Sequence, residues 1–213
     1  MTTKQRYEHI IKWFIDNMPV AETELDFDDP FSLLVSVILS AQCTDKRVNM
    51  ITPALINRFP TAEAMAEADT EEIFQYIKSC SYPNSKAHHL SGMSKMLVSD
   101  FGGKVPEKIE DLMKLPGVGR KTANVVTLVA FGNPAMPVDT HIFRVSERLG
   151  LTTHAKNPAD TERQLLKYLP DNALPVAHHW LILHGRYICV ARKPKCGECG
   201  LREWCRWYKI MCK

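Results

Sequence analysis

The chain has 213 residues, 45% of them hydrophobic and 24% charged, a balance typical of a globular protein and not of a disordered or collagen-like one. It is too long for a disulfide-stapled miniprotein and long enough for one large domain or two small lobes. The net charge is only +3, but residues 185–213 carry eight Lys and Arg against two Glu, which indicates either a polyanionic partner or a solubilising surface.

Nothing in the sequence indicates a membrane protein. The longest apolar stretch, residues 31–41, is shorter than a membrane span, and the first residues contain no signal-peptide core. We therefore expect a cytoplasmic protein without membrane association.

The predicted elements are all helices. Apolar residues at helical spacing predict a first helix that ends near Pro19, and a continuous apolar run after Asp28-Asp29-Pro30 predicts a buried central helix over residues 31–41. Further helices are predicted over 45–59, 61–68, 70–78, 86–101, 108–114, from about 120 to 131, and from about 140 to 149. No segment alternates with a period of two, so the expected fold class is all-α, with a crossing between two lobes at Gly132-Asn133-Pro134.

Four cysteines crowd the C-terminal region. Cys189, Cys196, Cys199 and Cys205 have six, two and five residues between them, and four thiolates at such spacing can surround an iron–sulfur cluster or a zinc ion. We expect Arg192, Lys193 and Lys195, in the first loop of this set, to face phosphates. The other cysteines, Cys43, Cys80 and Cys212, are interpreted as ordinary thiols, the first two in the core.

The segment LPGVGRKTA, residues 115–123, places two glycines directly before a helix. Gly117 and Gly119 permit close backbone approach, so the N–H groups at the helix start can cradle a phosphate. A plain turn between two helices is the alternative interpretation of the same pattern.

Two residues in the second half are candidates for chemistry. Lys121 shares a helix face with Val125 and Leu128, and an amine whose stem rests on apolar surface can act as a nucleophile and form a Schiff base, although most helical lysines are simply solvated. Asp139 precedes a helical apolar pattern that stops at Gly150, so it is predicted as a helix N-cap. A carboxylate in that position can also stabilise positive charge on a sugar.

The segments LPGVGRKTANVV and VDTHIFRV and the four-cysteine tail, in this order, resemble the endonuclease III family of DNA glycosylases over nearly the whole chain. The resemblance implies that residues 115–123, Leu115, Gly117, Gly119 and Arg120 among them, form a helix-hairpin-helix that binds DNA. It implies that Lys121 is the nucleophile, that Asp139 is the catalytic aspartate, and that Cys189, Cys196, Cys199 and Cys205 hold a [4Fe-4S] cluster. In LSAQCTDKRVN, residues 39–49, Gln42 would fill the gap left by an extruded nucleotide.

The resemblance also implies an architecture and an activity. Residues 22–133 would form a six-helix lobe, residues 1–21 plus 134–213 would form a discontinuous lobe with the cluster, and DNA would bind in the cleft between them. The expected activity is that of a bifunctional base excision repair glycosylase, which removes oxidised pyrimidines from duplex DNA and cleaves abasic sites through a lysine Schiff base. We expect a monomer whose partner is duplex DNA with damaged bases or abasic sites.

One segment departs from the family pattern. Many members have a Leu-Tyr pair in the loop that wedges into DNA, whereas this chain has Ser81-Tyr82-Pro83-Asn84, so Tyr82 is the candidate wedge. The nearest alternative enzyme is the related adenine-mismatch glycosylase, which typically has Ser at the position of Lys121 and a catalytic Glu near Ser36. From other classes, a non-catalytic helix-hairpin-helix DNA-binding module or an iron–sulfur redox module is the alternative.

Overall fold

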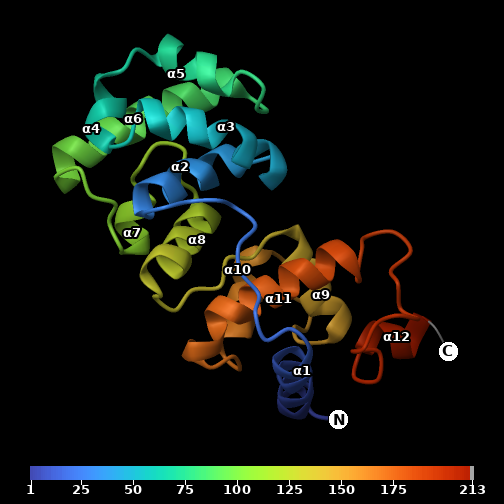
Figure 1. Cartoon of the computed structure of the whole chain (residues 1–213). Helices are drawn as coiled ribbons and strands as arrows, with labels where there is room; N and C mark the ends of the chain where they lie inside the picture. Colours follow the sequence, from blue (N-terminus) through green and yellow to red (C-terminus); the bar gives the residue numbers. More distant parts are fainter. Residues whose placement is uncertain (212–213) are drawn as a thin grey trace. The chain divides into compact units, whose positions relative to one another are not determined.

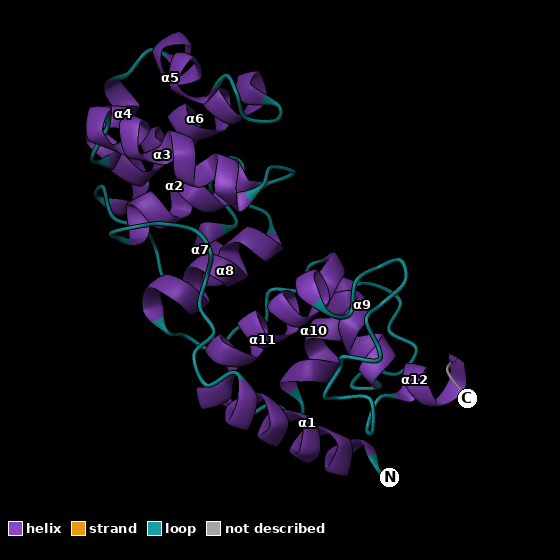
Figure 2. Cartoon of the chain, turned by 45° about the vertical axis from the view of Figure 1, so that its right-hand side comes forward, coloured by secondary structure: helices purple, strands orange, loops and turns teal. Residues whose placement is uncertain are grey.

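The computed structural model describes residues 1–211, and this part of the chain contains helices and loops but no strand (Figures 1 and 2). None of its helices is long and apolar enough to cross a membrane. Cys212 lies outside the described residues. The helices are α1 (Thr3–Asn17), α2 (Pro30–Ser40), α3 (Asp45–Arg58), α4 (Ala62–Glu67), α5 (Thr70–Ile77), α6 (Pro83–Phe101), α7 (Ile109–Leu112), α8 (Arg120–Phe131), α9 (Thr140–Leu149), α10 (Pro158–Leu166), the 3-10 turn η1 (Asp171–Ala173), α11 (Leu174–Tyr187) and α12 (Arg206–Met211).

The chain forms two compact units. One consists of Met1–Glu22 and Pro134–Lys213, and the other of Thr23–Asn133. We call the first the discontinuous unit and the second the continuous unit.

Helix α2 is the centre of the continuous unit. Asp29 caps it by accepting a hydrogen bond from the Ser32 N–H, while Pro30 occupies the first turn, where the absence of an N–H costs nothing. Every residue from Phe31 to Leu39 is buried, because α3, α6 and α8 pack against α2. The prediction of a buried central helix is confirmed.

The first helix packs within the discontinuous unit, against segments more than 140 residues later in the chain. The Phe14 ring stacks on Trp180 of α11 with 5.3 Å between the ring centroids, and the Trp180 indole donates to the Met18 carbonyl over 2.7 Å. The buried Tyr7 hydroxyl donates to the Leu151 carbonyl over 2.9 Å. These contacts make α1 part of the same core as α11.

The helices expected before Gly150 are present, with one clear difference at α6. That helix begins at Pro83 and not at Lys86, because Pro83 suits the first helical position after Tyr82, whose φ is +53°. The sequence patterns did not predict α10, α11 or α12. Helix α11 buries residues on several faces and so lacks a single apolar stripe.

Candidate functional site

The hairpin in the continuous unit connects α7 to α8 through a tight turn. The Val118 N–H donates to the Leu115 carbonyl, and the first backbone bond of α8 runs from the Ala123 N–H to the Gly119 carbonyl. The first turn of α8 thus directs backbone N–H groups, those of Lys121 and Thr122 among them, away from the carbonyls of its own helix. They carry the positive end of the helix dipole, which suits a phosphate.

The two glycines of the hairpin are required for different reasons. Gly117 has φ +80°, and a Cβ there would lie 2.8 Å from the His89 Cβ, so both conformation and packing require glycine. Gly119 has an ordinary extended conformation, with φ −89° and ψ 175°, and no protein atom lies within 4 Å of where its Cβ would be. Only an approaching ligand would make a side chain at Gly119 costly.

Lys121 and Arg120 are exposed on the first turn of α8. On the helix face where the sequence predicts that the Lys121 stem rests, Val125 is half-buried and Leu128 is buried. Leu115 is only 2% exposed and belongs to the hydrophobic core, so its side chain anchors the hairpin and does not face DNA.

Asp139 lies in the discontinuous unit as the N-cap of α9. Its Oδ1 accepts from the Ile142 N–H over 2.8 Å, which confirms the predicted cap. Its Oδ2 lies 2.8 Å from the His141 Nδ1, a contact that the sequence analysis missed. The carboxylate is thus held from both sides while part of it faces solvent.

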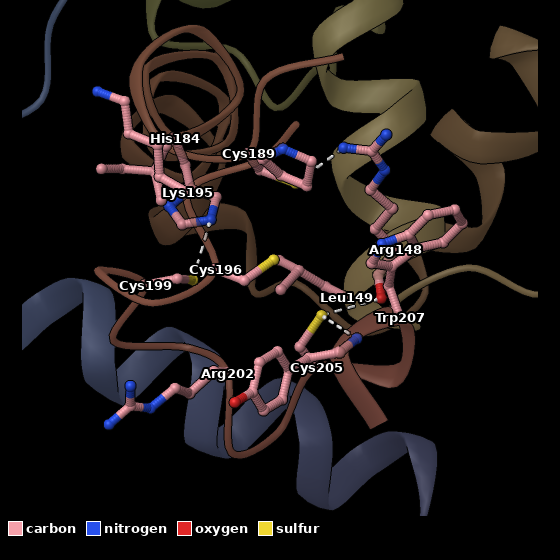
Figure 3. Close-up of a pocket in the computed structure, with 13 residues that line it drawn as sticks. Arg148, Leu149, His184, Cys189, Lys195, Cys196, Cys199, Arg202, Cys205 and Trp207 are labelled. Atoms are coloured by element: carbon pink, nitrogen blue, oxygen red, sulfur yellow. Dashed lines mark hydrogen bonds between the residues drawn. The ribbon is translucent and has the colours of Figure 1, made fainter. Parts of the chain in front are cut away.

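The four cysteines of the C-terminal region line one pocket in the discontinuous unit (Figure 3). Among the described residues, no three His, Cys, Asp or Glu side chains are grouped as they would be around a single metal ion. Four cysteines around one pocket are a ligand set that suits an iron–sulfur cluster or a zinc ion.

The chemistry of these donors also fits a polynuclear cation. Burial, and to a smaller extent the neighbouring cysteines, raises the pKa of the Cys199 thiol to about 11. Burial likewise raises the pKa of Cys205. Burial thus disfavours the thiolate form of these cysteines. Four thiolates in one partly buried pocket therefore require a strongly cationic partner, whose coordination deprotonates the thiols.

Arginines fasten the cysteine loop, residues 189–205, to α9. Arg148 donates to the Val190 and Ala191 carbonyls over 2.8 and 2.9 Å. Its Nη1 lies 3.6 Å from the Cys189 Sγ (Figure 3). Arg144 donates to the Cys189 carbonyl over 3.2 Å. Asp139 caps the same helix, so the loop and the aspartate share one rigid support.

Arg192, Lys193 and Lys195 are exposed on this loop, as the sequence predicted. The Lys195 side chain points away from the sulfurs (Figure 3), and Lys193 has φ +52°. Arg202 is a further exposed base that also points outward, and it donates to the Gly197 carbonyl. The loop therefore presents a cationic surface to solvent.

Gln42 and Tyr82 lie in two loops of the continuous unit that are joined to one another. We call residues 41–44 the Gln42 loop and residues 78–82 the Tyr82 loop. Gln42 and Tyr82 are exposed and have positive φ values of 55° and 53°. The Ser81 hydroxyl donates to the Gln42 carbonyl over 2.7 Å, so the two loops hold each other in place.

Comparison with known proteins agrees with this geometry. Residues 35–171 match the protein-family model of the HhH-GPD superfamily base excision DNA repair proteins, and residues 189–205 match that of the iron–sulfur binding domain of endonuclease III. Endonuclease III of Rickettsia felis is 47% identical over 199 residues, which are 93% of each chain. The chain belongs to the endonuclease III family. Endonuclease III of Bacillus subtilis is also 47% identical, over 90% of this chain and 87% of that protein.

Solved structures of the family match the whole fold. A trapped endonuclease III–DNA covalent intermediate, an estranged-adenine complex, is 41% identical and aligns over 100% of both chains with a TM-score of 0.93. The structure of a non-covalent endonuclease III–DNA complex aligns with a TM-score of 0.92, over 99% of this chain and 98% of that one. Family membership also identifies the cofactor of the cysteine loop as a [4Fe-4S] cluster.

Proposed function

We propose that this protein is a bifunctional DNA glycosylase of base excision repair, which removes oxidised pyrimidines from duplex DNA and cleaves the abasic sites that result. The observation that carries this proposal is the exposed Lys121 amine, two residues beyond the helix N-cap at Gly119. A phosphate held by the helix N-terminus brings the neighbouring sugar within reach of that amine. We place the activity in the cytoplasm, in association with the nucleoid if the cell is prokaryotic.

Lys121 acts as the nucleophile. The damaged base leaves the helical stack, which costs less for a lesion that pairs poorly. The Lys121 Nζ attacks the sugar C1′ as the bond to the base breaks, and the base departs with its electron pair. The product rearranges to a Schiff base, which acidifies the C2′ proton and permits loss of the 3′ phosphate by β-elimination.

Asp139 stabilises the positive charge that develops on the sugar during base departure. The N–H of Ile142 and the ring of His141 hold its two oxygens, so the carboxylate pays no reorganisation cost when the charge appears. It does not form a covalent bond in this scheme.

The remaining sites bind DNA. The hairpin backbone at Gly117, Gly119 and Arg120 holds a phosphate, while Leu115 supports the turn from the core. Gln42 fills the space that the flipped nucleotide vacates, and the exposed Tyr82 ring wedges beside it.

The cluster has a structural role in this scheme. Cys189, Cys196, Cys199 and Cys205 hold it, and it supplies a rigid cationic centre around which the loop folds. Arg192, Lys193 and Lys195 on that loop then dock on phosphates.

Borohydride trapping tests the proposal. The protein is incubated with duplexes that contain one thymine glycol or one abasic site, borohydride is added, and covalent protein–DNA adducts are separated. The wild-type protein should be trapped on both duplexes, and Lys121→Ala on neither. Lys4→Ala, which removes an exposed amine from α1, should be trapped like wild type.

Other outcomes contradict the proposal in different ways. Trapping on the abasic duplex alone reduces the protein to a lyase without the proposed base specificity. Trapping of Lys121→Ala assigns the nucleophile to another residue. No adduct on either duplex favours a non-catalytic DNA-binding or redox module.

A further inference from the structure

Two cysteines outside the cluster lie together between the Gln42 loop and the Tyr82 loop. Cys80 is 5% exposed, as expected for a core thiol, but Cys43 is only half-buried, which corrects its expected place in the core. They flank the contact between the loops, because Cys80 precedes Ser81, whose hydroxyl donates to the Gln42 carbonyl over 2.7 Å, and Cys43 follows Gln42. Both thiols are free.

A buried lysine completes the cluster. Lys86 is 4% exposed, and its Nζ donates to the Leu39 and Ala41 carbonyls over 2.8 Å each. The same ammonium group lies 3.3 Å from the Cys80 Sγ and 3.2 Å from the Ser81 Oγ. It therefore places a positive charge beside the cysteine pair.

The surroundings divide the two thiols into a nucleophile and a partner. Burial alone would raise the pKa of Cys43, but hydrogen bonds from the Ser81 N–H and the Cys80 thiol, together with the Lys86 charge, lower it below its ordinary value. Burial and the contact with Cys43 raise the pKa of Cys80. Cys43 is thus the more acidic and the more exposed of the two thiols, and Cys80 is the buried one, which is the arrangement of a reactive cysteine with a resolving one.

We propose that Cys43 and Cys80 are a peroxide-reactive pair that closes to a disulfide and thereby links the Gln42 loop to the Tyr82 loop. The oxidant is hydrogen peroxide. The Cys43 thiolate attacks one peroxide oxygen, the O–O bond breaks, and a sulfenic acid and hydroxide form. The Cys80 sulfur then attacks the Cys43 sulfur, the S–O bond breaks and water leaves, so that two thiols and one peroxide give one disulfide and two waters. A dithiol reductant reverses the change by exchange.

The consequence for DNA rests on the proposed function, in which Gln42 and Tyr82 enter the duplex. The disulfide joins the two sulfurs by a bond of about 2.05 Å with a narrow range of geometry, so it adds a covalent constraint to loops that the Ser81 hydrogen bonds to the Ala41 and Gln42 carbonyls connect. Gln42 adjoins Cys43 in the sequence. Gln42 and Tyr82 both have positive φ values, a backbone conformation that is unfavourable for residues other than glycine. A change in the backbone of either loop therefore shifts these side chains. Oxidation should therefore weaken DNA binding.

The first experiment locates the bridge. Reduced, cluster-loaded protein is treated with stoichiometric hydrogen peroxide, its remaining thiols are alkylated, and it is digested without reductant for mass spectrometry. A peptide pair joined through Cys43 and Cys80 is expected in wild type and absent from Cys43→Ser. In Cys80→Ala, dimedone should label Cys43, because the sulfenic acid has lost its resolving partner. Circular dichroism and the visible absorbance of the cluster establish that each variant is folded and loaded.

The second experiment measures binding to a duplex with a non-cleavable abasic analogue. The Kd of the wild-type protein should rise roughly tenfold after peroxide and recover with dithiothreitol, whereas Cys43→Ser should bind equally before and after.

Bridges that join other cysteines, or an unlabelled Cys43 in Cys80→Ala, would overturn the thiol assignment. A Cys43–Cys80 bridge that leaves the Kd unchanged would overturn the effect on DNA. If the reduced protein itself fails to bind DNA while the bridge forms, the proposed function fails and the thiol chemistry stands.

Discussion

In the proposed mechanism the Asp139 side chain performs two tasks, capping α9 and stabilising charge on the sugar, and substitution can separate them. Asparagine still accepts the Ile142 N–H but lacks charge, so Asp139→Asn should keep the stability of the protein and lower the rate of base release on the order of 10²–10³-fold. Asp139→Ala loses the cap as well and should be less stable by about 1 kcal/mol. Single-turnover kinetics and thermal melting distinguish the two effects. Equal rates for Asp139→Asn and wild type would reduce the residue to a cap.

Lys86 is predicted to stabilise the junction of the two loops. Lys86→Met removes the donor to the buried Leu39 carbonyl and to the Ala41 carbonyl, which should cost about 2 kcal/mol of unfolding free energy. Urea denaturation measures the change. Lys78→Met, at an exposed position of the Tyr82 loop, is the control and should differ from wild type by less than about 0.5 kcal/mol. Similar losses in both variants would contradict the role of these hydrogen bonds.

Residues differ in how far their sequence context predicts them. Asp139 was recognisable as a cap because the helix that follows it, the apolar face of that helix and the glycine that ends it, Gly150, all lie within twelve residues. Nothing near Lys86 in the sequence marks it as buried, because its acceptors Leu39 and Ala41 are more than 40 residues away. The positive φ of Gln42 and Tyr82 was equally unpredictable, since long-range contacts and not local preference impose it.

At the scale of elements, the hairpin glycines give a matched pair of variants. Gly119→Ala places a methyl group in open space and should cost less than about 1 kcal/mol of stability, but it should weaken DNA binding about tenfold because the methyl group meets the phosphate. Gly117→Ala should cost about 2 kcal/mol or more, because its φ is +80° and the new Cβ meets His89. Chemical denaturation and fluorescence anisotropy measure the two quantities. Normal DNA binding by Gly119→Ala would place the phosphate elsewhere.

The attachment of α1 predicts a pH dependence of stability. Burial, and secondarily Tyr168, raises the pKa of the Tyr7 phenol above its ordinary value of 10.0. Its stabilising contribution is complete below pH 10 and is lost as the pH rises toward the folded-state pKa, because the unfolded chain releases this proton first. Tyr7→Phe should therefore show a flatter decline in stability above pH 10, measured by urea denaturation at several pH values. An unchanged slope would contradict this role of Tyr7.

A helix could be predicted from the sequence where its apolar residues form a single stripe along one face. Helix α9 shows such a stripe and was found, whereas α11 buries residues on several sides and was missed. The start of α6 was misplaced by three residues, since the local pattern does not reveal that Tyr82 adopts a left-handed conformation.

At the scale of the whole molecule, charge on the cysteine loop should appear in the salt dependence of DNA binding. The double variant Arg192→Gln, Lys195→Gln should lower the slope of log K against log salt by about one per lost phosphate contact, that is by about two. The control variant Lys4→Gln, Lys12→Gln removes the same charge from the exposed face of α1 and should leave the slope unchanged. Equal changes in both would mean that net charge alone, and not the loop, sets the affinity.

The division of the chain between its two units determines the order in which they can be completed during synthesis. Residues 23–133 contain everything that the continuous unit needs, so it can fold while the ribosome is still making the rest. Helix α1 leaves the ribosome first, yet its packing partner Trp180 is made more than 160 residues later. The N-terminal helix must therefore wait, with Phe14 uncovered, until almost the entire protein has been translated. A prematurely terminated chain would retain the hairpin and Lys121 in a folded unit but leave α1 without its core.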